Sequence, residues 1–461
     1  MPETLLWAPR AWIAGRWQES VLLEVDRQGY WAGIQPGVAT PPAGARVLPG
    51  PVLPGMVNSH SHAFQRAFAG LSERRDSDAD DFWSWRDRMY RVALRITPAQ
   101  MQAVAAHLYV ELLRGGYTQV CEFHYLHHDP QGQAYADPAR LGWAVADAAQ
   151  QAGLGLTLLP VLYERAGFAQ PTLRDDQRRF ASTPALVYDL SRTAANARRP
   201  LLNAGVAIHS LRAASATSIR ALLQQVGDAP LPIHIHIAEQ TQEVEDCQQA
   251  TGQRPIAWLC DQLPLDRRWQ LVHATHANAT EIIAVAASAA AVVICPSTEG
   301  NLGDGLTDLP GWLSHGVAMA IGSDSHVTRN WPEELRWLEY GQRLMRRQRN
   351  VAASPAHQPA TAARLFDAAV AAGANAAGQA RWGLVAGARA DALVLDTRAP
   401  ALLGLPASHL LDALVFAGAE PALAEVLVAG NTVLRHGRHA QEQTITTDYK
   451  NAMDDLWADA A

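Results

Sequence analysis

The stretch of sequence that decides the fold runs from Val52 to His62 and reads VLPGMVNSHSH. Its apolar beginning predicts a buried β-strand, and its end places two histidines, His60 and His62, two positions apart. Residues i and i+2 of a strand project to the same face, so both imidazoles can face one metal ion at the C-terminal end of the strand. Barrel enzymes place their chemistry at that end. The pair alone is weak evidence, because paired histidines also occur as ordinary polar loop residues.

More apolar runs follow along the chain, separated by Ala-, Leu-, Arg- and Gln-rich stretches with helical spacing. The resulting βα units predict an α/β fold in which a parallel sheet closes into a (β/α)8 barrel, or TIM barrel, whose core needs about 250 residues. A doubly wound open sheet is the alternative, but the sequence has no GxGxxG turn. The predicted strands are Val52–Asn58, Thr118–Phe123, Leu156–Leu162, Ala204–His209, Pro232–Ala238, Gln270–Ala274, Ala291–Pro296 and Ala318–Ser323.

The two flanks of the chain have a different pattern, with short candidate strands separated by glycines. This pattern predicts a small β-sandwich built jointly from the N-terminal and C-terminal segments. The expected boundaries are 1–52 for the first part of the sandwich and 53–381 for the barrel. Residues 382–461 then supply the second part of the sandwich and a C-terminal tail.

Composition excludes several classes of function. The 461 residues are 48% hydrophobic, and the net charge of −7 does not attract nucleic acid or an anionic membrane. The longest nearly apolar run, Ile282 to Cys295, is shorter than the roughly 20 residues that span a bilayer. The N-terminal sequence does not have the pattern of a signal peptide, and the scattered cysteines do not form a disulfide framework. We expect a cytoplasmic protein that binds neither nucleic acid nor membrane.

The basic residues exclude further mechanisms. Lys450, near the C-terminus, is the only lysine in the sequence. A P-loop lysine, a Schiff-base lysine and a carboxylated lysine that bridges two metal ions are therefore all excluded.

Polar residues that could bind metal or move protons also follow three later strands. The fifth predicted strand ends in HIHIAE, the sixth in LVH, and the eighth is followed by SDSH. Each of these residues could by itself be an ordinary hydrogen-bonded polar group. Their order along the chain is more informative, because all four strand ends meet at one face of a barrel. The candidate residues are His60, His62, His236, Glu239, His273 and Asp324.

This ordered series resembles the amidohydrolase superfamily over nearly the whole chain. The resemblance implies a barrel of the metal-dependent amidohydrolase type, with His60, His62, His236 and Asp324 as metal ligands. Members that have no carboxylated lysine on the fourth strand hold one metal ion, and the fourth strand here contains no lysine. Zn2+ suits such a ligand set best, and Fe2+ or Mn2+ are also tolerated.

Six separated segments narrow the resemblance to the formiminoglutamate deiminase family within that superfamily. They are HSHAFQRAFAGL, DDFWSWRDRMYRV, CEFHYLHHD, GVAIHSLRA, HIHIAEQTQEVEDC and LVHATH. The resemblance implies a hydrolase that acts on the C–N bond of a linear amidine. It would convert N-formimino-L-glutamate to N-formyl-L-glutamate and ammonia in histidine degradation. The resemblance also suggests a homodimer.

The residues fit a hydrolytic mechanism. Three neutral imidazoles and one carboxylate suit Zn2+ and leave a position for water, whose pKa can then fall to about 7. We expect Asp324 to accept the proton of the water and His273 to hydrogen-bond the attacking oxygen and the tetrahedral intermediate. Glu239 lies three residues beyond His236, where it could deliver a proton to the leaving nitrogen.

A dicarboxylate substrate needs cationic and hydrogen-bonding partners. A planar guanidinium binds a carboxylate through two parallel hydrogen bonds, and Arg212, just after the fourth strand, is the best candidate. Each candidate could instead have a surface or capping role. The other predicted substrate-binding residues are Gln65, Arg86, Tyr125 and His209.

Two other functions remain open. A different hydrolase of the same superfamily could act on a planar heterocycle such as a purine, a pterin or an imidazolone, and would favour aromatic stacking over paired carboxylate contacts. A catalytically inactive scaffold would be free to lose metal ligands, whereas this chain has every candidate ligand and proton-transfer residue.

Overall fold

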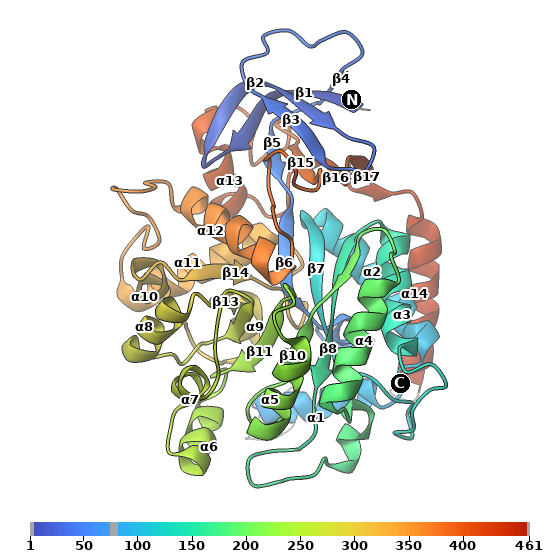
Figure 1. The fold of residues 1–461 in the computed structure, drawn as a ribbon. Coiled ribbons are helices and arrows are strands. Elements are labelled where there is room, and N and C mark those ends of the chain that lie inside the picture. The colour runs from blue at the N-terminus through green and yellow to red at the C-terminus, as the bar shows by residue number, and fades with distance from the viewer. Residues whose placement is uncertain (1–3, 74–81, 459–461) are drawn as a thin grey trace.

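The computed structural model describes residues 4–73 and 82–458. Eight parallel strands and a short extra one form one of the two sheets, which confirms the predicted (β/α)8 barrel (Figure 1). The barrel strands are β6 (Met56–Ser61), β7 (Tyr117–His124), β8 (Gly155–Leu162), β9 (Leu202–Ala204), β10 (Val206–Ile208), β11 (Ile233–Ile237), β12 (Trp269–His273), β13 (Ala291–Ile294) and β14 (Ala318–Ile321). Their hydrogen-bonded order is β6-β7-β8-β10-β11-β12-β13-β14, with β9 paired to β8.

Helices follow most of the barrel strands and pack around the sheet. Their starts carry the expected signals. Thr97 and Gln100 form a capping box at α2, Asn278 and Glu281 form one at α8, and several helices have proline in their first turn. The α-helices are α1 (Phe82–Ala93), α2 (Pro98–Arg114), α3 (Arg140–Ala152), α4 (Pro184–Asn196), α5 (Ala216–Val226), α6 (Thr241–Thr251), α7 (Pro255–Gln262), α8 (Ala279–Ser288), α9 (Pro296–Leu302), α10 (Leu309–Ser314), α11 (Trp331–Arg346), α12 (Thr361–Ala376), α13 (Leu410–Phe416) and α14 (Glu442–Trp457). The 3-10 helices are η1 (Ala63–Ala67), η2 (Asp175–Phe180) and η3 (Ala407–His409).

The two flanks of the chain join in a second, mixed sheet at one end of the barrel (Figure 1). Its strands are β1 (Thr4–Ile13), β2 (Arg16–Val25), β3 (Trp31–Gln35), β4 (Arg46–Val47), β5 (Val52–Pro54), β15 (Ala392–Leu395), β16 (Leu423–Val428), β17 (Asn431–Arg435) and β18 (Arg438–His439). The N-terminal and C-terminal segments meet where β5 pairs antiparallel with β15. Buried side chains of both segments form one hydrophobic cluster, separate from the barrel core.

The predicted strand Val52–Asn58 is wrong as a single element, because it divides at Gly55. Val52–Pro54 belongs to the second sheet, whereas Met56–Ser61 opens the barrel. A Cβ atom at Gly55 would lie only 2.2 Å from Oγ1 of Thr118, so the close approach at the junction requires glycine. One apolar run therefore supplies strands to both sheets.

The predicted C-terminal tail contains the long helix α14, which packs against the barrel rather than the second sheet (Figure 1). The ring of Tyr449 stacks on His107 of α2 with centroids 4.1 Å apart. Trp457 Nε1 donates a hydrogen bond to the carbonyl of Ala67, at the end of η1. The last helix thus buttresses the segment that follows the two histidines.

The barrel closes between its first and last strands, β6 and β14. Asp324 N donates to the carbonyl of His60 at 3.0 Å, and His62 N donates to the carbonyl of Asp324 at 3.4 Å. Ser61 and Asp324 form a parallel bridge at the same place. Closure of the sheet therefore brings residues more than 260 positions apart to one point.

None of the helices in the described ranges combines the length and the apolar character needed to span a membrane.

We expect Gly322→Ala to destabilise the closed barrel by about 1–3 kcal/mol, the usual cost of overpacking a filled site. The added Cβ would lie 2.6 Å from Cβ of His60, so the closing strands would have to move apart. Gly167→Ala is the control, because nothing lies within 4 Å of its added Cβ. Scanning calorimetry should give a lower Tm for Gly322→Ala than for the control. Equal Tm values would contradict this account of the closure.

Candidate active site

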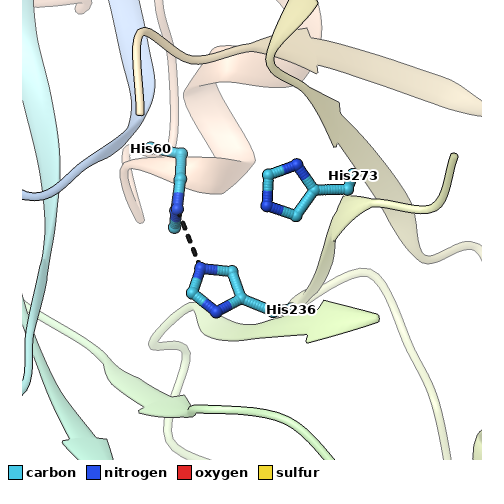
Figure 2. Close-up of side chains that lie close together, drawn as sticks. All are labelled: His60, His236 and His273. Atoms are coloured by element: carbon cyan, nitrogen blue, oxygen red, sulfur yellow. Dashed lines mark hydrogen bonds between the residues drawn. The ribbon is translucent and has the colours of Figure 1, made fainter. Parts of the chain in front are cut away.

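Four of the predicted residues converge at the C-terminal ends of the barrel strands. His60 Nε2 lies 3.1 Å from His62 Nε2 and 2.9 Å from His236 Nε2. Asp324 Oδ1 lies 3.4 Å from His60 Nε2 and 3.3 Å from His62 Nε2. Figure 2 shows His60 and His236 in contact, with the ring of His273 beside them. The structure thus brings together side chains from β6, β11 and the end of β14.

The protonation of the histidines makes this cluster a candidate cation site. Burial lowers the pKa of His60 to about 4 and that of His62 to about 3, so both rings are neutral near pH 7. His62 Nδ1 faces the carbonyl of Phe123 at 3.0 Å, and because a carbonyl only accepts, the ring proton is on Nδ1. His62 Nε2 therefore presents a lone pair to the cluster.

Hydrogen bonds alone do not satisfy these atoms. One proton on His60 Nε2 could serve only one of the three polar atoms that face it, whereas a cation attracts all the lone pairs at once. Ligand atoms bound to one Zn2+ at about 2.1 Å lie roughly 3 Å apart. The measured separations, between 2.9 and 3.4 Å, fit that geometry.

Two further side chains lie within reach of the same point. The groups of possible ligands are His60 with His62 and Asp324, His60 with His236 and His273, and His273 with Cys295 and Asp324. Cys295 was not singled out in the sequence, where nothing distinguishes it from the other cysteines. Its thiol is fully buried, and burial holds its pKa well above the usual range.

His273 lies among carboxylates at the end of β12. Its Nε2 is 3.7 Å from Glu239 Oε1 and 3.9 Å from Asp324 Oδ2, and its Nδ1 is 3.6 Å from Glu299 Oε1. Burial alone would lower the pKa of His273, but these carboxylates outweigh it and raise the pKa to about 10. The ring is thus a hydrogen-bond donor beside the candidate cation site.

The two predicted acids differ in their surroundings. Burial raises the pKa of Glu239 to about 7, although His273 and Arg212 act in the opposite direction. Burial also opposes the ionisation of Asp324, but its hydrogen bond to His60 and the nearby histidines hold its pKa well below the usual range. The carboxyl group of Glu239 can therefore hold a proton near neutral pH, while that of Asp324 stays ionised.

The backbone is strained where these residues leave their strands. Ala238 has φ 51°, His273 has φ 68° and Asp324 has φ 46°, all in the left-handed region that costs a non-glycine residue about 1–3 kcal/mol. Glu243 stabilises the first of these turns, since its carboxylate accepts the N–H groups of Ala238 and Glu239. These three turns thus carry or directly precede side chains of the site.

A single cavity joins the cluster to all five predicted substrate-binding residues: Gln65, Arg86, Tyr125, His209 and Arg212. Arg212 is buried, and its Nη1 atom has no hydrogen-bond partner among the described residues; the same holds for Nε of Arg86 and Oε1 of Gln65. Gln65 Nε2 donates to the hydroxyl of Tyr125 at 3.3 Å. The cavity therefore contains one buried and one partly buried arginine with unused hydrogen-bonding capacity.

Arg212 is held in place by a second arginine, Arg165, which no sequence pattern had indicated. Arg165 donates to the backbone carbonyls of Leu211, Arg212 and Ala214 at 2.7 to 3.1 Å. The guanidinium of Arg212 lies 5.2 Å from the ring centroid of Trp83, and that of Arg86 lies 4.5 Å from the same ring. Aromatic faces of α1 thus support both cations.

Other functional positions were also missed. Glu122, on β7, accepts hydrogen bonds from Ser61 Oγ at 2.7 Å and from Ala63 N at 2.6 Å, and so fixes the loop that carries the first two histidines. A glutamate within the apolar run TQVCEF was the signal that could have indicated it. The missed cavity-lining residues are Phe82, Trp85, Met89, Tyr90, Tyr163, Phe180 and Leu302.

Histidines outside the cluster have other partners. His234 Nε2 contacts the carbonyl of Ala376 at 2.9 Å, one pleat deeper in the barrel than His236. His326 contacts Ser323 Oγ at 3.0 Å and the carbonyl of His62 at 3.2 Å. Both rings support the backbone near the site rather than joining the group of possible ligands.

Comparisons with known proteins place this arrangement among named relatives. The sequence pattern of the amidohydrolase family matches residues 52–433. Formimidoylglutamate deiminase of Pseudomonas aeruginosa is 46% identical over 452 residues, which cover 98% of this chain and 99% of that protein. The 5-methylthioadenosine/S-adenosylhomocysteine deaminase of Natronomonas pharaonis is 27% identical over 383 residues, which cover 83% of this chain and 81% of that protein.

Solved structures are similar over the full length as well. The crystal structure of an amidohydrolase from Brucella melitensis has a TM-score of 0.93 and 39% identity, and the match covers 98% of this chain and 100% of that one. An adenosine deaminase from Xanthomonas campestris with bound zinc has a TM-score of 0.79 and 21% identity, with 99% of each chain covered. The second likeness concerns the fold alone.

We expect His236→Gln to reduce the tightly bound divalent metal of the purified protein to below about 0.1 equivalent, because the change removes one of the four candidate ligands. His234→Gln is the matched control, since it makes the same change on the same strand outside the cluster and should keep about one equivalent. Elemental analysis after dialysis measures both. Full metal content in His236→Gln, or equal loss in both variants, would show that the ion does not bind at this cluster.

Proposed function

Because this chain belongs to the amidohydrolase family, we propose that it hydrolyses N-formimino-L-glutamate to N-formyl-L-glutamate and ammonia, a step of histidine degradation. The observation that carries the proposal is the cavity in which a cluster of possible metal ligands faces the buried Arg212 and the partly buried Arg86, both incompletely paired. The 46% identity to a formimidoylglutamate deiminase supports the same reaction.

The metal ligands in this proposal are His60, His62, His236 and Asp324, and the ion is a single Zn2+, with Fe2+ or Mn2+ as alternatives. When bound, such an ion supplies Lewis acidity, which makes water nucleophilic near neutral pH. A carboxylated lysine that would bridge a second ion is excluded, because the only lysine is Lys450. The separations of 2.9 to 3.4 Å between the donor atoms support this ligand set.

Three side chains move or hold protons in the reaction. Asp324 accepts a proton from the attacking water, and His273 donates a hydrogen bond from Nε2 to the oxygen that becomes negatively charged. Glu239, whose pKa is raised to about 7 by burial, carries a proton to the nitrogen that leaves as ammonia. Glu239 Oε1 and His273 Nε2 lie 3.7 Å apart, which supports the proposal that both side chains act at the same reacting carbon.

The charges of the cavity match the charges of the substrate. The formimino group is a cation, and it faces the end where Glu239 and Asp324 lie. The two carboxylates of the substrate face the end where Arg212 and Arg86 lie, with Gln65, Tyr125 and His209 as hydrogen-bonding partners. Burial and the neighbouring Arg212 hold the pKa of His209 well below the usual range, so its ring is neutral.

A planar heterocyclic substrate is the second candidate function. The aromatic lining of the cavity favours it, as does the 27% identity to a 5-methylthioadenosine/S-adenosylhomocysteine deaminase. However, two of these aromatic side chains already face arginines, since Arg212 lies over Phe82 and Arg86 lies over Tyr90. A ring system could not stack on those faces without displacing the cations, so the dicarboxylate is the better match.

The homodimer and the cytoplasmic location expected from the sequence stay predictions. Light scattering coupled to size-exclusion chromatography would measure the first, and cell fractionation the second.

We expect the purified, metal-replete protein to release one ammonia for each molecule of N-formimino-L-glutamate consumed. The formimino carbon gains the oxygen of water and loses its terminal nitrogen, while it stays bonded to the nitrogen of glutamate. A coupled ammonia assay and mass spectrometry of N-formyl-L-glutamate measure the two products. Absence of turnover in a sample with one bound metal equivalent would reject the proposal.

The variant Arg212→Met tests whether the cavity binds a dicarboxylate substrate rather than a heterocyclic one. Loss of two charge-assisted hydrogen bonds should lower kcat/KM for N-formimino-L-glutamate by on the order of 100-fold or more. The exposed Arg192→Met is the control and should keep the unsubstituted rate. An unchanged kcat/KM in Arg212→Met would show that Arg212 does not bind a carboxylate of the substrate and would contradict this match of charges.

A further inference from the structure

Gln177 has no role in the reaction described so far, yet it lies directly behind the cavity. It belongs to η2, in the loop after β8, and its side chain is fully buried. Its neighbours are the hydroxyl groups of Tyr163, at 2.9 Å from Nε2, and of Tyr90, at 3.3 Å from Nε2. Both tyrosines line the cavity, Tyr90 from α1 and Tyr163 from the end of β8.

The orientation of the Gln177 amide follows from its third contact. The backbone N of Arg174 lies 3.0 Å from Oε1 of Gln177, and a backbone N–H can only donate. The atom that faces Arg174 is therefore the oxygen, and the amide nitrogen must face the two phenols. Each of its two N–H groups donates to one phenol oxygen.

This arrangement leaves hydroxyl protons for a ligand. A phenol oxygen that accepts from Gln177 has its own O–H directed elsewhere. The two hydroxyls also interact with each other, which uses at most one of the two protons. Within residues 4–73 and 82–458, neither hydroxyl donates a hydrogen bond to any other protein acceptor. At least one O–H is thus available to the cavity.

The charged groups around the hydroxyls of Tyr90 and Tyr163 determine which kind of hydrogen-bond acceptor can bind there. Burial holds the pKa of Tyr163 well above the usual range, so the phenol keeps its proton, and Arg212 and Arg86 are close enough to influence it. The guanidinium of Arg86 lies 5.6 Å from the ring centroid of Tyr90. An anionic oxygen placed against these arginines would also meet the phenols, whereas an amidinium offers no acceptor.

We propose that Gln177 is a positioning residue that orients the hydroxyls of Tyr90 and Tyr163 so that at least one of them donates a hydrogen bond to a carboxylate group of the substrate. The inference rests on the proposed function, because it names a further contact of the same dicarboxylate. Tyr90 and Tyr163 then determine specificity together with Arg212, and Gln177 acts through them without touching the substrate.

Gln177→Glu tests the direction of these hydrogen bonds. The glutamate still accepts from the backbone N of Arg174, but it offers acceptors instead of donors to the phenols and so draws their protons away from the cavity. We expect KM for N-formimino-L-glutamate to rise roughly 10- to 100-fold, the effect of losing a hydrogen bond to a charged group, while kcat changes by less than about 3-fold. A fall in kcat with an unchanged KM would overturn the inference.

A double-mutant cycle separates positioning from general support of the fold. The variant Tyr90→Phe/Tyr163→Phe should raise KM about as much as Gln177→Glu does. Adding Gln177→Glu to that tyrosine variant should change KM by less than about a further 2-fold. Additive effects would show that Gln177 acts independently of the tyrosines and would overturn the inference. If Gln177→Glu does not fold, as judged by its Tm, the Tyr90→Phe/Tyr163→Phe variant decides, and an unchanged KM in that variant contradicts the proposal.

The affinity for glutarate tests the role of Gln177 without relying on turnover of the proposed substrate. Glutarate has two carboxylates and no amidine, so calorimetry on the metal-loaded protein reports the carboxylate contacts without turnover. We expect Gln177→Glu to weaken glutarate binding roughly 10-fold or more. No turnover by the unsubstituted protein rejects the reaction, whereas equal glutarate affinity in both proteins, or no binding to either, rejects the role of Gln177.

Discussion

The site depends on the backbone hydrogen bonds that close the barrel. Asp324 N donates to the carbonyl of His60, and His62 N donates to the carbonyl of Asp324, so the residues that close the sheet are also candidate metal ligands. The fit is tight, since a Cβ at Gly322 would collide with His60. Geometry at the site is therefore set by the sheet, which is far stiffer than a loop.

The same closure creates unfavourable interactions that a bound cation would offset. Neutral imidazoles face one another through Nε2 atoms about 3 Å apart, a buried carboxylate lies beside them, and turns at Ala238, His273 and Asp324 have left-handed φ angles. Glu122 and Glu243 hold the surrounding backbone by accepting its N–H groups. In this account, folding assembles the ligands at a cost, and the metal stabilises the assembled state.

The features that could be predicted from the sequence are those with a pattern among residues close together along the chain. Apolar runs separated by helical spacing indicated the barrel strands, and the period of two in HSH and HIH indicated which histidines share a face. The division of the first run at Gly55 was missed because it depends on contact with Thr118, which is distant in sequence. Gln177, Tyr90 and Arg165 were missed for a related reason: their tasks arise from contacts between loops and α1, and those contacts leave no periodic pattern.

In the proposed site, one divalent ion binds to nitrogen and oxygen atoms alone, although the thiol of Cys295 is within reach of His273 and Asp324. X-ray absorption spectroscopy at the metal edge of the loaded protein identifies the ligand atoms. We expect nitrogen and oxygen ligands at about 2.0–2.2 Å with an imidazole signature. A sulfur ligand at about 2.3 Å, or a second metal at about 3.5–4 Å, would show that the proposed site is wrong.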